Sequence, residues 1–412
     1  MGGLPKGVDM SRIWIDWQEL NRKKQNKKII YFGEGEWIDK TISKLDLDGD
    51  FIVDNNKFVQ GRTYLGLTIH SPEKLKTINK DKYMILIMTT GYWAVCDQLE
   101  SYGFEAGKHF AVSPSLKNYK VIEDIQSVST QLLISCYDTE DKDFGGGLYH
   151  YDINEMSYQK VFSGRCHGIS CYGEHFYVID DSVTGVRIFD NKLVEEKILT
   201  LPKGIGPHGI AYHPDEQCIA VAQSSTDSVC FYDTNDSSLL NQINISDKYQ
   251  HTNVAQHHIN DIMILGNSLY VSMFSITGNW KRGVFDGGIL EYNIKTGKCY
   301  GTVVSNLWCP HSILLANNAI SYLDSMRGDL YDTTWIKITS IPGWARGLAF
   351  DGHYYFIGQS LHRHLDRLTG ASNNIPINAG IYIVDPVTKA TRFLHLPEIT
   401  NIHALSVYDS AL

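Results

Sequence analysis

The sequence predicts two domains, a small α/β domain followed by a β-propeller, and three observations lead to this fold class. The chain has 412 residues, of which 43% are hydrophobic and 20% charged, which is enough material for more than one core. Residues 29–118 alternate short apolar runs with segments of helical periodicity. Residues 119–412 consist of short strand-like segments that recur with a period of about 47 residues.

The first domain is predicted from its alternation of strand and helix. Its strand-like runs are IIYFG at 29–33, FIVDNN at 51–56 and YMILIMTT at 83–90, and helical patterns follow the first and the last. Such alternation is typical of a parallel sheet covered by helices. Residues 1–28, with the basic run NRKKQNKK at 21–28, are expected to form a separate, solvated helical arm.

The turn after the first strand carries part of a dinucleotide-binding pattern. Gly33 and Gly35 supply the first two glycines, whereas Ile38 stands where the third would be. Asp54 follows the second strand about 20 residues later, where an acidic group could meet a ribose hydroxyl. These three residues are the predicted nucleotide-binding residues, and a tight strand-to-helix turn without a ligand is the alternative.

Composition and charge exclude several classes of partner. The formal net charge of −9 argues against nucleic acid, and no apolar segment is long enough for a signal peptide or a membrane span. The eight cysteines include no CxxC pair and lie mostly in apolar runs. The sequence therefore predicts a cytoplasmic protein with reduced cysteines.

The second domain is predicted to be a propeller because one pattern repeats along it. The segments EDIQSVSTQLLIS, HGISCYGEHFYVI, NDIMILGNSLYVS, HSILLANNAISYL and RGLAFDGHYYFIG align without gaps. About four short strands per repeat is the pattern of a propeller blade. Six complete copies favour six blades, with HALSVYD closing the ring on the first blade, and seven blades remain the alternative. The copies begin at Glu123, His167, His208, Asn260, His311, Arg346 and His403.

The residues that begin the copies are predicted to meet at one mouth of the channel. In a propeller the innermost strand of each blade lines the channel, so strand starts far apart in sequence converge. Converging neutral imidazoles suit zinc or a similar divalent transition metal. The predicted metal ligands are His167, His208, His258 and His311. The predicted catalytic residues are Glu123 as base or as a further ligand, Arg346 for a substrate carboxylate or phosphate, and His403.

Two resemblances accompany this interpretation. The segments YFGEGE, FIVDNN and YMILIMTT resemble the small Rossmann-like modules beside bacterial sugar-nucleotide and glycan-modifying enzymes, which implies a nucleotide-like ligand. The strand starts CHGIS and PHGIA are similar to the six-bladed superfamily of senescence-marker lactonases, peptidyl-hydroxyglycine amidating lyases and streptogramin lyases. The set HHINDI, GGILEYN, CPHSIL, WARGLAF and GIYIVD resembles, more closely, a bacterial family of uncharacterised propeller proteins.

Three functions follow as hypotheses. The first is a metal-dependent lyase or hydrolase that acts at the channel mouth on a small anionic substrate, such as a sugar or nucleotide derivative. The second is a non-catalytic propeller that binds a glycan or a protein. The third is a nicotinamide-dependent oxidoreductase built on the N-terminal domain, which the missing third glycine disfavours. The substrate, the metal and the oligomeric state are left open by the sequence.

Overall fold

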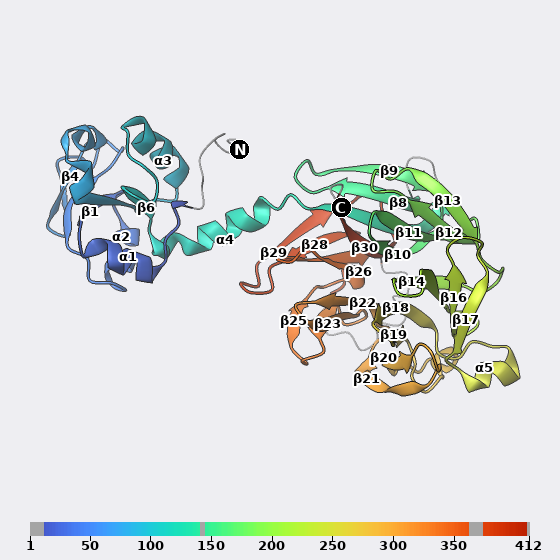
Figure 1. The fold of residues 1–412 in the computed structure, drawn as a ribbon. Coiled ribbons are helices and arrows are strands. Elements are labelled where there is room, and N and C mark those ends of the chain that lie inside the picture. The colour runs from blue at the N-terminus through green and yellow to red at the C-terminus, as the bar shows by residue number, and fades with distance from the viewer. Residues whose placement is uncertain (1–11, 141–144, 362–373, 410–412) are drawn as a thin grey trace. The chain divides into compact units, whose positions relative to one another are not determined.

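The computed structural model describes residues 12–140, 145–361 and 374–409, and it separates the chain into two units, Met1–Asp124 and Ile125–Leu412 (Figure 1). The helix α4, Lys117–Gln126, crosses this division, so the predicted boundary at residue 118 falls inside a helix. Among the described residues, no helix combines the length and the apolar character needed to cross a membrane.

The N-terminal unit is an α/β module with a mixed six-stranded sheet in the order β3-β4-β2-β1-β5-β6. Five strands are parallel and β3 pairs antiparallel at the edge. The strands are β1 Lys28–Phe32, β2 Gly49–Val53, β3 Thr63–Tyr64, β4 Leu67–His70, β5 Tyr83–Ile87 and β6 Phe110–Val112, and the helices before α4 are α1 Trp17–Lys24, α2 Glu36–Ile42 and α3 Tyr92–Ser101. The predicted α/β class is confirmed at this level of description.

Residues 12–28 differ from the predicted separate arm. Ile13 and Leu20 are completely buried in the cores of the α/β module, and Trp14 forms a β-bridge with Val112. Asp16 caps α1 by accepting a hydrogen bond from the backbone of Glu19. The arm prediction rested on the basic run, but those lysines lie at the exposed C-terminal end of a helix whose apolar face packs on the module.

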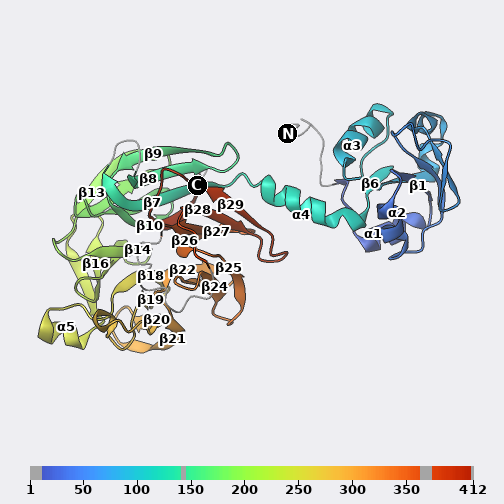
Figure 2. The same cartoon turned by 180° about the vertical axis from the view of Figure 1, so that it is seen from behind.

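The C-terminal unit is a six-bladed β-propeller, as predicted. Its described strands form six four-stranded antiparallel sheets arranged around a centre, with β13 and β21 at the rim in both views (Figures 1 and 2). The blades are β10 Cys166–Tyr172, β11 His175–Asp180, β12 Gly185–Phe189 and β13 Glu195–Thr200; β14 Pro207–His213, β15 Cys218–Gln223, β16 Ser228–Asp233 and β17 Leu239–Asn244; β18 Ile259–Leu265, β19 Ser268–Met273, β20 Gly287–Asn293 and β21 Cys299–Leu307; β22 His311–Ala316, β23 Ala319–Asp324, β24 Asp329–Asp332 and β25 Lys337–Ser340; β26 Trp344–Phe350, β27 Tyr355–Ser360, β28 Gly380–Val384 and β29 Thr391–His395; and β30 Ile402–Tyr408, β7 Gln131–Glu140, β8 Gly145–Asp152 and β9 Ser157–Ser163. The helix α5, Asp247–Thr252, lies between β17 and β18.

The ring closes because its last strand joins its first blade. The strand β30 pairs antiparallel with β7, in a register that places Ile402 opposite Cys136 and Tyr408 opposite Gln131. This confirms the prediction for HALSVYD. The segment EDIQ, in contrast, is helical, so Glu123 does not begin an inner strand, and His403 of β30 takes that place in the ring.

Side chains of the inner strands tie neighbouring blades together. An inner strand is a sheet edge, so alternate backbone N–H groups point out of the blade and need acceptors. Ser170 of β10 accepts from Tyr212 N of β14 at 3.0 Å. Asp261 accepts from Ile313 N at 2.8 Å and Ser312 from Gly347 N at 3.2 Å. These inter-blade hydrogen bonds fix the inner strands relative to one another.

Replacing Ser135 is expected to loosen ring closure. Its buried hydroxyl accepts from Ala404 N and donates to the carbonyl of His167, so Ser135→Ala leaves two buried backbone groups without their partner. We expect the free energy of unfolding to fall by about 2 kcal/mol. Urea denaturation of the full chain measures this loss. Ser157→Ala, at an exposed position of β9, is the control, and equal losses in the two variants would contradict the role of Ser135.

Candidate functional site

The candidate site is a ring of six side chains, one from each innermost strand. Each of these strands has a register irregularity where the ring residue lies, and such bulges re-aim side chains. The ring residues are His167 of β10, His208 of β14, Asn260 of β18, His311 of β22, Arg346 of β26 and His403 of β30. The structure therefore brings together the predicted strand starts, except for Glu123.

Arg346, His403 and His167 form a connected chain of hydrogen bonds. Arg346 Nη2 lies 2.9 Å from His403 Nδ1, and His403 Nδ1 lies 3.0 Å from His167 Nδ1. A guanidinium only donates, so His403 Nδ1 carries a lone pair and the neutral ring holds its proton on Nε2. His167 then donates from Nδ1 and keeps a lone pair on Nε2. Asn401 Oδ1 accepts from Arg346 Nη1 at 3.1 Å and steadies the guanidinium.

His208 and His311 have the same tautomer for a simpler reason. His208 Nδ1 lies 3.1 Å from the carbonyl oxygen of Gly206, and His311 Nδ1 lies 2.9 Å from that of Cys309. A carbonyl oxygen only accepts, so both Nδ1 atoms carry the proton and both Nε2 atoms present a lone pair. Three ring imidazoles thus offer hydrogen-bond acceptors.

Burial and charge keep the ring histidines neutral. Burial is the largest cause that lowers the pKa of His167, His208, His311 and His403, and the charge of Arg346 contributes at each of them. The pKa of His208 falls to about 4, and those of the other three lie well below their usual value. Near neutral pH the ring therefore combines one cation with four neutral imidazoles.

Aromatic side chains surround the ring on one side. The centroid of the Tyr137 aromatic ring lies 4.4 Å from the centroid of the His167 imidazole. The centroid of the Trp344 indole lies 5.8 Å from that of the His311 imidazole. His258 stands beside the ring at 5.4 Å from His208 and packs against Phe274 and Trp280. These walls enclose a polar centre in an apolar frame.

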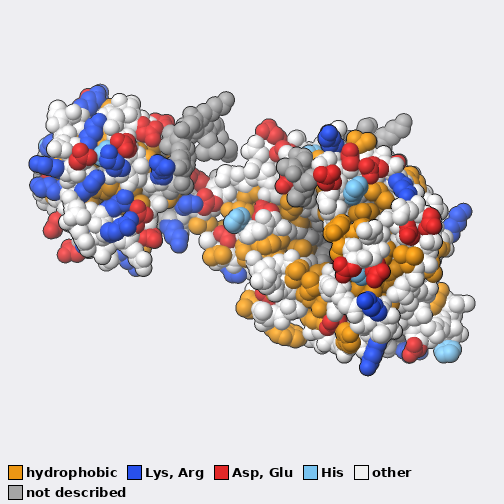
Figure 3. All heavy atoms as spheres, viewed as in Figure 1, with side chains coloured by type: hydrophobic (Ala, Val, Ile, Leu, Met, Phe, Trp, Pro, Cys, Tyr) orange, Lys and Arg blue, Asp and Glu red, His pale blue; other side chains and the backbone are white. Residues whose placement is uncertain are grey.

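The ring divides the channel into two cavities. The mouth cavity, about 410 Å³, lies before the ring and includes the aromatic walls, Asp181, Ser224 and Asn401. The channel chamber, about 370 Å³, is lined by the ring and by the inner-strand residues that follow it. His208, His311, Arg346 and His403 line both. Hydrophobic side chains surround a hollow at the centre of the propeller face in Figure 3.

The predicted metal ligands do not fit a shared metal centre in this arrangement. The rings of His167 and His208 are stacked, with centroids 4.5 Å apart and an interplanar angle of 28°. Arg346 also places a positive charge within 2.9 Å of His403. In the described part of the chain, no three His, Cys, Asp or Glu side chains form a group that could hold a metal ion. Elemental analysis of protein without a histidine tag tests the metal prediction directly.

The other predicted site residues lie in the N-terminal unit. Glu123, on α4, accepts hydrogen bonds from the Tyr92 hydroxyl and, at 2.5 Å, from Trp93 Nε1. The prediction that Glu123 begins an inner strand is therefore wrong, because the spacing of apolar residues around it is that of the helix α4. Its catalytic role stays a prediction.

Gly33, Gly35 and Asp54 do come together, at the ends of β1 and β2. Both glycines have positive φ, 103° and 126°, and Asp54 Oδ2 accepts a hydrogen bond at 2.8 Å from the backbone N–H of Glu34 between them. The Asp54 carboxylate thus accepts the hydrogen bond of one backbone N–H group that a phosphate would otherwise accept. Nucleotide binding at this turn stays a prediction.

Several residues of the site were not predicted from the sequence. Tyr137, Phe274, Trp280, Trp344 and Asn401 line the mouth, and Asp261 lines the chamber. Trp344 and Asn401 lie two residues before ring positions, so a search for side chains flanking each strand start would have found them. Trp280 lies in a connection whose course the repeat does not determine.

Comparison with known proteins identifies a family. The model of a domain of unknown function, DUF4915, matches residues 186–409, which is more than half of the chain and runs from β12 to β30. The chain belongs to the DUF4915 family. Five of the six ring residues, all except His167, lie within the matched DUF4915 segment.

The DUF4915 chain is also similar to solved structures that cover about two thirds of it at low sequence identity. A nidogen/laminin complex is 13% identical with a TM-score of 0.49, covering 68% of this chain and 99% of that one. A protein of unknown function from Bacteroides caccae is 10% identical with a TM-score of 0.47, covering 68% of this chain and 100% of that one. No curated protein matches the DUF4915 sequence.

The depressed pKa of His208 predicts a specific pH dependence of stability in this DUF4915 protein. Because the folded pKa, about 4, lies below the ordinary 6.5, the stability that the neutral ring contributes is complete above pH 6.5 and is lost as pH falls towards 4. Between pH 7 and pH 4, the unfolding free energy of the wild type should therefore fall by on the order of 3 kcal/mol relative to that of His208→Asn.

Urea denaturation at several pH values measures this shift. The comparison with wild type at each pH removes the contributions of all other titrating groups. His251→Asn changes an exposed histidine of α5 and is the matched control. A difference between wild type and His208→Asn that is constant over this range would contradict the buried, neutral state of His208.

Proposed function

We propose that the mouth of the propeller binds a small hydroxylated anion, such as an acidic sugar. The observation that carries this proposal is the position of Arg346: its charge lowers the pKa of all four ring histidines, so its positive field extends across the ring. A guanidinium in a partly desolvated cavity pairs well with a carboxylate or phosphate, because its planar fork matches two oxygens. The anionic ligand predicted from the sequence fits this charge.

The neutral histidines suit the remainder of such a ligand. His167, His208 and His311 each present an Nε2 lone pair, and a sugar offers hydroxyl donors to such acceptors. Their tautomers are fixed by backbone or ring partners, so the acceptors are oriented before a ligand arrives. Neutral imidazoles also keep the site from holding four additional positive charges.

The aromatic walls add shape and apolar area. Trp280, Trp344, Phe274 and Tyr137 line the same cavity of about 410 Å³, which falls within the usual size of small-molecule sites. Flat rings that surround a few oriented polar groups are typical of pockets for sugars and similar molecules. The mouth thus combines one cation, several acceptors and apolar walls.

A lyase or hydrolase activity is the finer form of this proposal. A carboxylate held by Arg346 would place its α-carbon among the neutral imidazoles, and an imidazole Nε2 can accept a proton. Anion binding also offsets the charge of Arg346, which would raise the imidazole pKa values towards the range where a base is effective.

Replacing Arg346 is expected to weaken anion binding selectively. We expect D-glucuronate to bind the wild type and glucose to bind much more weakly, because only the former carries a carboxylate. Arg346→Lys keeps the charge but loses the two-pronged geometry, so affinity for glucuronate should fall about 10-fold, and Arg346→Gln should lose roughly 100-fold. Isothermal titration calorimetry of the full chain measures both.

The control tests whether any arginine in the propeller has this effect. Arg392→Lys, on the outermost strand β29, should leave glucuronate affinity unchanged. Calorimetry in two buffers of different ionisation enthalpy also reports proton uptake, which should accompany glucuronate binding below pH 6 as the ring pKa values rise. Equal binding of glucose and glucuronate, or undiminished binding by Arg346→Gln, would overturn the proposal.

A further inference from the structure

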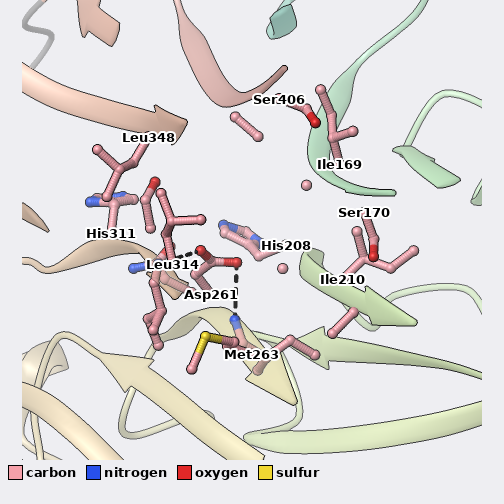
Figure 4. Close-up of a pocket in the computed structure, with 18 of the residues that line it drawn as sticks. Ile169, Ser170, His208, Ile210, Asp261, Met263, His311, Leu314, Leu348 and Ser406 are labelled. Carbon is pink, nitrogen blue, oxygen red and sulfur yellow. Dashed lines mark hydrogen bonds between the residues drawn. The ribbon is translucent and has the colours of Figure 1, made fainter. Parts of the chain in front are cut away.

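The channel chamber on the far side of the ring has its own chemistry. Apolar inner-strand side chains such as Ile169, Ile210, Leu314 and Leu348 alternate with polar groups along its walls, and a carboxylate, Asp261, projects into it (Figure 4). The chamber occupies about 370 Å³ and shares only ring residues with the mouth. A cavity that combines apolar side chains with oriented polar groups can serve as a small-molecule site.

Asp261 is held firmly in this chamber. Its Oδ2 accepts from Ile313 N at 2.8 Å and its Oδ1 from Ile262 N at 3.0 Å, as the dashed lines of Figure 4 show. The backbone of Gly209 packs directly against it, because a Cβ on Gly209 would lie 2.6 Å from Asp261 Cα and 2.8 Å from Oδ1. Only glycine permits this approach, so the carboxylate is fixed between the strands β14 and β22.

The inter-blade hydrogen bond does not need a charge at this position. Ser312 follows its ring residue as Asp261 follows Asn260, and a neutral hydroxyl accepts the backbone N–H of Gly347 there. Ser170 does the same for Tyr212 N of the next blade. An aspartate is costlier, since burial opposes ionisation and raises its pKa to about 6. The inter-blade hydrogen bond of Asp261 therefore does not require its negative charge.

Asn260 supplies a second, independent indication of a ligand. Its side chain is only 4% exposed, it lines the chamber and not the mouth, and its Nδ2 has no hydrogen-bond partner among the residues that the structure describes. A buried amide donor without an acceptor is costly. A ligand oxygen in the chamber would satisfy it, beside the carboxylate of Asp261.

We propose that the channel chamber is a second binding site, which takes a small amine with an apolar body and a hydroxyl or carbonyl oxygen. The ammonium group pairs with Asp261, the oxygen accepts from Asn260 Nδ2, and the apolar body lies against Ile210, Leu314 and Leu348. A buried carboxylate gains most from a cation that is desolvated with it. This site is separate from the anion site at the mouth and does not depend on it.

Calorimetry with defined probes tests this assignment. We expect 2-amino-1-phenylethanol to bind the full chain at pH 7.5, and styrene glycol, which has a hydroxyl in place of the amine, to bind at least 10-fold more weakly. Asp261→Asn keeps an oxygen acceptor for Ile313 N but removes the charge, so it should weaken the amine roughly 10- to 100-fold. Asn260→Ala should weaken 2-amino-1-phenylethanol but leave 2-phenylethylamine, which lacks the hydroxyl, unchanged.

The pH dependence provides a further readout. Amine affinity of the wild type should fall as pH drops through about 6, where Asp261 takes up a proton. The other titratable or charged groups of the chamber are Arg346, Cys171, Tyr212, His208, His311 and His403. The histidines have pKa values well below this range, and the pKa values of Cys171 and Tyr212 are raised, so Asp261 is the group that titrates there.

A measurement on the wild type keeps the test independent of variant folding. Cys171 and Cys299 are both exposed thiols, but only Cys171 lines the chamber. The amine should slow alkylation of Cys171 by iodoacetamide and leave Cys299 unaffected, as read by peptide mass spectrometry. If Asp261→Asn does not fold, Asp261→Ser, which copies Ser312, replaces it. Absence of amine binding by the wild type, equal binding of amine and diol, or undiminished binding without the carboxylate would overturn the proposal.

Discussion

The pairing of β30 with β7 is the constraint on which the centre of the propeller depends. This one antiparallel pairing joins residues 402–408 to residues 131–136 and turns six blades into a closed ring. It also brings His403 beside His167, although the two are 236 residues apart. Two serines hold β30 at this junction. The Ser135 hydroxyl accepts a hydrogen bond from Ala404 N, and the Ser360 hydroxyl donates one to the carbonyl of Ile402. Without closure the inner strands would have no common axis, and neither cavity would exist.

Electrostatics then gives the two cavities different characters. On the ring, burial and the charge of Arg346 work in the same direction and favour neutral imidazoles. At Asp261, burial alone raises the pKa, while two backbone N–H groups oppose that rise. The channel therefore has a cation among neutral acceptors at the ring, and beyond the ring an anion, Asp261, that lines only the chamber.

The sequence predicted the propeller and most of the ring because both follow from one repeated pattern. Strand starts at a fixed position of each repeat must converge, so His167, His208, His311, Arg346 and His403 could be placed without coordinates. Glu123 could not, because a helix and a strand start share similar apolar spacing in EDIQ, and only ring closure decides that β30 supplies the missing strand. The burial of Leu20 was missed because the basic run beside it dominated the local composition. Asp261 was missed because its role depends on Gly209 and Ile313, which lie on neighbouring blades.

The order of strands along the chain has a consequence for biosynthesis. Domains begin to fold while the ribosome is still adding residues, and earlier segments fold first. The inner strand of the first blade, however, is β30, which follows every other strand of the propeller in the chain. A nascent chain can form five blades and still lack His403, the partner of both Arg346 and His167. The ring of six side chains is thus completed in a single late step, and a translation product that stops before residue 402 would have blades but no assembled centre.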